Sequence, residues 1–107
     1  MALTRDFKST VVARVKADRK FANALLDEAG TLFLNGDPET AKLVLRDLVN
    51  ATIGFKQLAQ SVEKPAKSVH RMLSAAGNPT MTSLASIFAS LNNSMKVKMH
   101  ARAVRLD

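Results

Sequence analysis

The polar residues of one short segment have the spacing and the chemistry to read a nucleic acid. Four side chains in residues 66–75 recur at helical intervals of three and four: Lys67, His70, Arg71 and Ser74. Each can donate hydrogen bonds and none is acidic. Guanine presents two major-groove acceptors within reach of Lys or Arg, and phosphate oxygens accept from Ser or backbone N–H groups. The pattern predicts a helix that tests base edges with Lys67, His70 and Arg71, and Ser68 is a further candidate DNA contact.

A second short segment precedes this one and completes a predicted helix-turn-helix. Residues 54–61 have the length of a short helix, and a tight turn joins them to residues 66–75. Lys56 and Gln57 open the first helix, where side chains and helix N-termini often contact phosphate. Asn78 follows the second helix and is a candidate contact to the DNA backbone. The residues predicted to seat the second helix on the first are apolar: Ala66, Val69, Met72 and Leu73.

The charge of the chain favours the same partner. Sixteen basic and nine acidic residues give a net charge of +7 and a sequence pI near 10.3, which attracts polyanions. Residues 1–36 hold six basic and four acidic residues, residues 37–62 three of each, and residues 63–107 seven and two, or +2, 0 and +5. A membrane-surface helix would place Trp or Phe opposite a basic face, and Trp is absent, so no membrane partner is expected. Two alternatives stay open: an ordinary αα-hairpin with a solvated polar face, and lysines that are only solvated surface.

The composition argues against an enzyme. Cysteine is absent, which excludes disulfides, thiolate zinc sites and a cysteine nucleophile. His70 has no ligand partner at useful spacing, His100 is expected on the surface, and no acidic pair lies where its pKa would be raised. We therefore expect no catalytic residue, metal, cofactor or small-molecule substrate. No apolar run approaches the roughly 18 residues of a membrane span and no signal sequence is evident, which predicts a cytoplasmic protein.

Hydrophobic periodicity predicts that helices position these residues in one all-α domain, a compact helical bundle of residues 1–107. Residues 3–51 are expected to form three helices, the second of which ends at Asn35-Gly36, because glycine accepts the left-handed conformation there. The third has Pro38 in its first turn. The predicted N-caps of the three helices are Thr4 or Asp6, then Asp18, and then Asp37.

The remaining residues are predicted to form a closing helix and a tail. Residues 52–91 contain the helix-turn-helix and a last helix that begins at Thr82 as N-cap and ends before Asn92-Asn93. In the tail, residues 92–107, apolar and polar residues alternate from Met95 to Arg102, which is the period of a half-buried strand. A lone strand needs a partner. We expect residues 95–103 to pair across the two-fold axis of a homodimer, or else to be a mobile tail.

Two sets of residues carry a resemblance to known proteins. One is similar to the lambda-repressor-like (XRE-type) helix-turn-helix pattern: Leu58-Ala59, Val62, Ser68-Val69, Arg71, Gly77 to Thr80, and Leu84. The other resembles HigA-like addiction-module antidotes, the antitoxins of type II toxin–antitoxin pairs: Leu3 to Lys8, Leu32 to Ala41, Leu45 to Phe55, Lys64-Pro65, Lys67-Ser68, His70 to Leu73, and Gly77 to Thr80. The resemblance covers about residues 3–91.

The resemblance implies an antitoxin and transcriptional repressor, which binds a RelE-like (HigB-like) toxin and the double-stranded operator of their shared operon. Two positions depart from the pattern: Glu63 stands where glycine is common, and Ala66 where serine is expected. A left-handed conformation would cost Glu63 roughly 1–2 kcal/mol. We therefore expect a turn of another shape, aided by Pro65.

An acidic segment is the candidate face for a basic toxin. Residues 27–47 carry five carboxylates against Lys42 and Arg46, a balance of −3. The carboxylates are Asp27, Glu28, Asp37, Glu39 and Asp47. Two other functions remain as alternatives: a repressor of phage or mobile-element type without a toxin, and a protein-interaction adaptor that has lost DNA binding.

Overall fold

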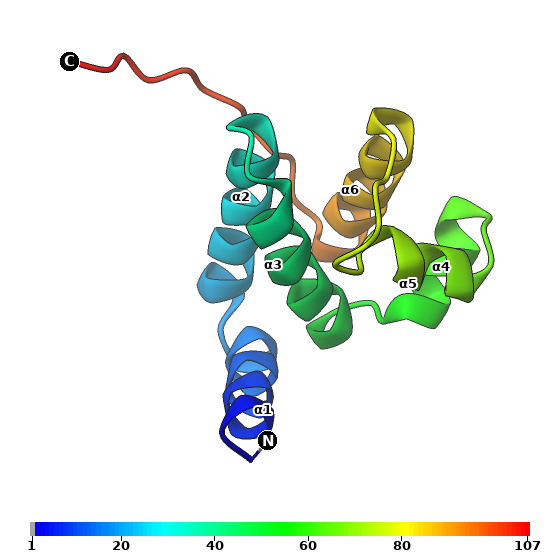
Figure 1. Ribbon diagram of the computed structural model, residues 1–107. Coiled ribbons are helices and arrows are strands. Elements are labelled where there is room, and N and C mark those ends of the chain that lie inside the picture. Colours follow the sequence, from blue (N-terminus) through cyan, green and yellow to red (C-terminus); the bar gives the residue numbers. More distant parts are fainter. Residues whose placement is uncertain (1) are drawn as a thin grey trace.

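Six α-helices make up the regular structure of the protein in the computed structural model, which describes residues 2–107 and the side chains of residues 10–107 (Figure 1). No strand occurs in this part of the chain, so the protein is all-α as predicted. The helices are α1 (Ala2–Ala17), α2 (Arg19–Leu34), α3 (Pro38–Ala51), α4 (Phe55–Val62), α5 (Ala66–Met72) and α6 (Met81–Met95). No helix among residues 2–107 is both long and apolar enough to cross a bilayer.

Local signals set the boundaries of α2 and α3 as predicted. The carboxylate of Asp18 accepts the N–H groups of Lys20 and Phe21 at 3.0 and 3.3 Å and so caps α2. At the other end of α2, Gly36 has a φ of +84°, the left-handed conformation that glycine adopts without strain. Asp37 then caps α3 by accepting the N–H of Thr40 at 3.3 Å.

Other boundaries differ from the prediction. Helix α1 begins at Ala2, ahead of Thr4 and Asp6, whose side chains lie outside the described part. The N-cap of α6 is Thr80 and not Thr82, because the Thr80 hydroxyl accepts the N–H of Ser83 at 3.1 Å. Helix α6 also continues through Asn92-Asn93 to Met95. Asparagine is a weak helix former but not a helix breaker, so the apolar contacts of α6 outweigh it.

The helices form two groups that share one core. Helices α1–α3 pack together on one side and α4–α6 on the other, with α3 leading into α4 (Figure 1). The largest fully buried side chains come from both groups: Leu26, Leu45, Leu48, Val49, Leu58, Val69, Leu73, Ile87 and Leu91. Between α4 and α6 the hydroxyl of Ser90 donates to that of Ser61 at 2.7 Å. The apolar residues of α2, α3, α4 and α6 therefore face the core.

The C-terminal tail is extended but is not a strand. Beyond α6 the chain turns back and runs along α2 before it leaves the bundle (Figure 1). Met95, Val97 and Met99 are half-buried against the core, and Lys96, Lys98 and His100 are exposed. The alternation is real, but the partner is the chain's own helix bundle rather than a second strand. Met95, Val97 and Met99 are thus covered within one chain, and pairing of this segment across a dimer axis stays a prediction.

Candidate nucleic-acid interface

Helices α4 and α5 are two short helices joined by a tight turn, in the segment where the helix-turn-helix is predicted. The turn between them has Glu63 in the left-handed conformation, with φ +56° and ψ +46°. The N–H of Lys64 closes the turn on the carbonyl of Ala59 at 3.0 Å. The expectation that Glu63 would force another turn shape is wrong. The bonds of the turn and the burial of Leu58 and Val69, both 0% exposed, outweigh the backbone strain.

An aromatic stack joins the start of α4 to α5. The rings of Phe55 and His70 lie 3.9 Å apart with an angle of 18° between their planes. Phe55 is buried, at 7% exposure, whereas His70 is exposed. One face of the His70 ring is thus covered by Phe55, while the residue stays open to solvent. The sequence predicted the exposure of His70 but not this packing role.

The polar face of α5 is largely as predicted. Lys67, His70 and Arg71 are all exposed. Ser74 lies beyond the end of the helix at Met72, and its hydroxyl donates to the carbonyl of Arg71 at 2.7 Å. This hydrogen bond satisfies a carbonyl at the end of the helix. The Ser74 hydroxyl is therefore not the free donor that the sequence suggested. Ala66, expected to seat α5 on α4, is exposed at the first turn instead.

Three of the predicted contact residues line one groove beside α5. The groove has a volume of about 290 Å³ and lies between α5 and the loop that follows it. Ser68 and Arg71 line it from the helix and Asn78 from the loop, together with Met72, Ala76 and Gly77. Residues 66–79 contain no carboxylate. The groove therefore combines hydrogen-bond donors and positive charge, the chemistry that phosphate oxygens and guanine edges require.

A buried lysine holds this loop in place. Lys42 of α3 is 4% exposed, and its ammonium group donates to the carbonyls of Gly77 at 2.7 Å and Ala75 at 3.3 Å. The carboxylate of Glu39 lies 3.8 Å from the same nitrogen. At Gly77 an added Cβ would lie about 2.0 Å from the carbonyl oxygen of Arg71, so only glycine fits. Neither Lys42 nor this close approach was identified from the sequence.

Lys56 and Gln57 lie at the open end of α4. Both are exposed, and the N-cap residue, Gly54, provides no side-chain hydrogen bond to the first turn. The Phe55–His70 stack brings this end of α4 beside α5. The first turn of α4 therefore offers uncapped N–H groups next to a lysine, an arrangement that suits a phosphate.

The acidic residues predicted to meet a toxin divide into two kinds. Asp37 and Glu39 are exposed but engaged, the first as the N-cap of α3 and the second beside Lys42. Asp27 and Glu28 are exposed on α2, and among the described side chains neither has a hydrogen-bond or ion-pair partner. The fifth carboxylate, Asp47, is half-buried on α3, so Asp27 and Glu28 are the exposed carboxylates of this segment without a partner among the described side chains.

Comparison with known proteins adds no relative. No protein-family model, no curated protein sequence and no solved structure matches the chain. Inference about function therefore rests on the residues and their geometry.

Proposed function

We propose that the protein is a sequence-specific DNA-binding repressor that docks α5 in the major groove of its operator. The observation that carries the proposal is the exposed, carboxylate-free face of α5 beside the groove of Ser68, Arg71 and Asn78. The net charge of +7 adds attraction to a polyanion. No step of this function is catalytic.

The residues divide the work between affinity and specificity. Lys56, Gln57, Ser68 and Asn78 meet phosphates, while Lys67, His70 and Arg71 reach base edges. Arg71 is the main reader, because its planar fork can bond both major-groove acceptors of guanine. The protein acts as a cytoplasmic homodimer, whose symmetry would space two half-sites by one helical turn, about 34 Å.

Two substitutions separate specificity from affinity. Arg71→Ala should cost about 1–3 kcal/mol on operator DNA and flatten the preference for operator over random duplex. Lys56→Ala should weaken both duplexes alike and lower the slope of log K against log salt by about 1. The measurement is a titration of the chain's own upstream DNA and of a random duplex at several salt concentrations. Lys20→Ala, which removes an exposed lysine of α2, is the control.

The outcomes decide between the proposal and its alternatives. Arg71→Ala that binds operator as well as the unaltered chain would remove α5 as the reader. Absence of duplex binding at any salt concentration would favour a protein-interaction adaptor.

We further propose that the repressor is also the antitoxin of a basic, RelE-like toxin. Support comes from the resemblance in the sequence and from the exposed, unpaired carboxylates of Asp27 and Glu28. The double charge reversal Asp27→Lys and Glu28→Lys should slow association with the toxin encoded beside the chain, most at low salt. An unchanged association rate would show that Asp27 and Glu28 do not contact the toxin. A gene neighbourhood without a toxin would favour a repressor of phage or mobile-element type.

A further inference from the structure

A second basic site lies away from the helix-turn-helix, where three helices end and one begins. A cleft of about 410 Å³ is bounded by the ends of α1, α3 and α6 and the start of α2. Three cations from three separate helix ends line it, Lys16, Arg19 and Lys96. Its other lining residues are Val15, Ala22, Asn23, Thr52, Ser94 and Met95, so no carboxylate is present. The volume lies within the usual range for small-ligand sites.

The cations exceed what the helix ends require. Each helix C-terminus carries roughly −0.5 charge and each N-terminus roughly +0.5, so three of the first and one of the second amount to about −1. The three cations supply +3 and the Asp18 carboxylate that caps α2 supplies −1, which leaves the surroundings of the cleft at about +1. A phosphate group carries about −1.5 to −2 at neutral pH and is attracted by that excess of positive charge.

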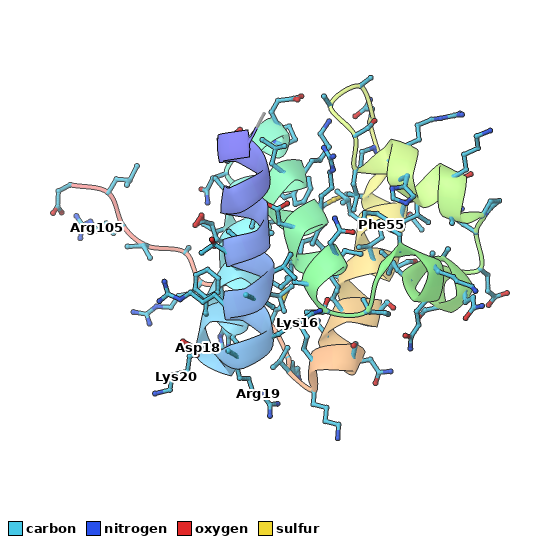
Figure 2. All side chains as sticks on the ribbon, turned by 90° about the horizontal axis from the view of Figure 1, so that it is seen from below. Lys16, Asp18, Arg19, Lys20, Phe55 and Arg105 are labelled. Atoms are coloured by element: carbon cyan, nitrogen blue, oxygen red, sulfur yellow. The ribbon has the colours of Figure 1, made fainter. Side chains whose placement is uncertain are left out.

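The backbone and a hydrogen bond fix two of these cations at the cleft, where they can bind an anion. The Arg19 guanidinium donates one N–H to the carbonyl of Met95 at 3.1 Å, which fixes it across the cleft and leaves its other N–H groups free. Lys96 has a φ of +56°, a conformation that is unfavourable for lysine and usual for glycine. Figure 2 shows Lys16 and Arg19 beside the end of α6, whereas Lys20 points away from it.

An unused polar group lies in the same cleft. The side-chain oxygen of Asn23 is buried and has no hydrogen-bond partner among the described residues. A half-turn of the amide would turn its NH₂ group to the same place, where it would donate to an anion. Ser94 is exposed at the cleft and can donate as well. Val15, Ala22 and Met95 provide an apolar wall.

We infer that this cleft binds a phosphate-bearing ligand, with Lys16, Arg19 and Lys96 on the phosphate and Asn23 and Ser94 as further donors. The phosphate could belong to a small molecule or to a nucleic-acid backbone, and the chemistry of recognition is the same for both. The inference does not depend on α5 reading DNA, because it shares no residue with that face.

Titration of the full ¹⁵N-labelled chain with inorganic pyrophosphate tests the site. We expect saturable shifts of the amide signals of Asn23, Ser94 and Lys96. Lys16→Gln and Lys96→Asn should each weaken pyrophosphate binding by about fivefold or more, the effect of one unit charge about 4 Å away in water. Asparagine tolerates the left-handed conformation, so Lys96→Asn removes the charge and keeps the backbone. Arg19→Gln should weaken binding as well.

Lys20→Gln is the matched control, because it removes an exposed cation that does not line the cleft. Its affinity for pyrophosphate should equal that of the unaltered chain. Equal weakening by Lys20→Gln, or the absence of saturable shifts at the cleft, would overturn the inference. A random 12-base-pair duplex distinguishes the sources. If the duplex displaces pyrophosphate and shifts the same amide signals, the phosphate belongs to a nucleic-acid backbone. If the duplex does not displace pyrophosphate, the phosphate belongs to a small molecule.

Discussion

The ammonium nitrogen of Lys42 lies 2.7 Å from the carbonyl oxygen of Gly77, a residue 35 positions later in the chain. This bond ties α3, in the first group of helices, to the loop that directly follows α5. Because Asn78 is the next residue, the placement of a candidate DNA contact depends on a buried lysine in another part of the fold. The Lys42–Gly77 bond is therefore the most informative place to perturb the loop without touching its surface.

Lys42→Met should lower the free energy of unfolding by about 1–3 kcal/mol, because the carbonyls of Ala75 and Gly77 lose their donor. Methionine keeps most of the buried stem, so the loss reports on the hydrogen bonds rather than on a cavity. Urea unfolding gives the free energy, and amide exchange should quicken at residues 75–79. Lys20→Met, at an exposed position, should change neither. Unchanged stability of Lys42→Met would show that the bonds contribute nothing net.

Glu63→Gly should stabilise the protein by roughly 0.5–1 kcal/mol, because glycine relieves the left-handed strain but adds entropy to the unfolded chain. Glu63→Gln removes the same charge and keeps the strain, so it serves as the control. The difference in unfolding free energy between the two variants isolates the backbone effect. Equal stability of the two would mean that Glu63 is not strained in solution.

His70→Ala should destabilise the protein by about 0.5–1.5 kcal/mol through loss of the stack on Phe55. His70→Phe keeps a ring on Phe55 and removes the ring nitrogens, so its thermal midpoint should stay near that of the unaltered chain. If His70 also reads a base, His70→Phe will still lose operator affinity. Full operator binding by a stable His70→Phe variant would restrict His70 to packing.

Gly30→Ala and Met99→Ala should be coupled. A Cβ at Gly30 would lie 2.6 Å from the terminal methyl of Met99, and no other heavy atom beyond its own helix backbone and chain neighbours is within 4 Å. Alanine is worth about 1 kcal/mol over glycine inside a helix. Gly30→Ala should give this full increase in stability only in the double variant, because Met99→Ala removes the methyl group that the new Cβ would meet. Urea unfolding of both single variants and the double variant measures the coupling, and strictly additive effects would show that the tail does not rest on α2.

The sequence predicted the helices well because their signals are local. Asp18, Gly36 and Asp37 act on their nearest neighbours, and the apolar stripes follow the helical period. The features that escaped prediction depend on distant partners. Lys42 sits three residues before Leu45 and seven before Val49, on the buried side of α3, and this inward position was the one available signal. Its carbonyl partners, 33 and 35 residues away, left no trace in the pattern.

The alternating tail shows a second kind of limit. A period of two records only that every second side chain is covered, and it does not identify what covers it. Likewise, the free-energy cost of a left-handed Glu63 could be predicted from the sequence. Its compensation by the packing of Leu58 and Val69 could not. For the candidate interface, the residue types on α5 were predictable, whereas the stack under His70 and the engaged hydroxyl of Ser74 required coordinates.

The tail along α2 also determines where a protease can cut. Trypsin needs several residues of extended, unattached chain on each side of a basic residue, and Arg102 is exposed beyond the last packed residue, Met99. Lys96 and Lys98 are equally exposed, but the residues between and after them are packed against the core. Cleavage after Arg102 should thus be immediate, while cleavage after Lys98 waits for the segment to detach from α2. The rate of that second cut would report how often the segment opens.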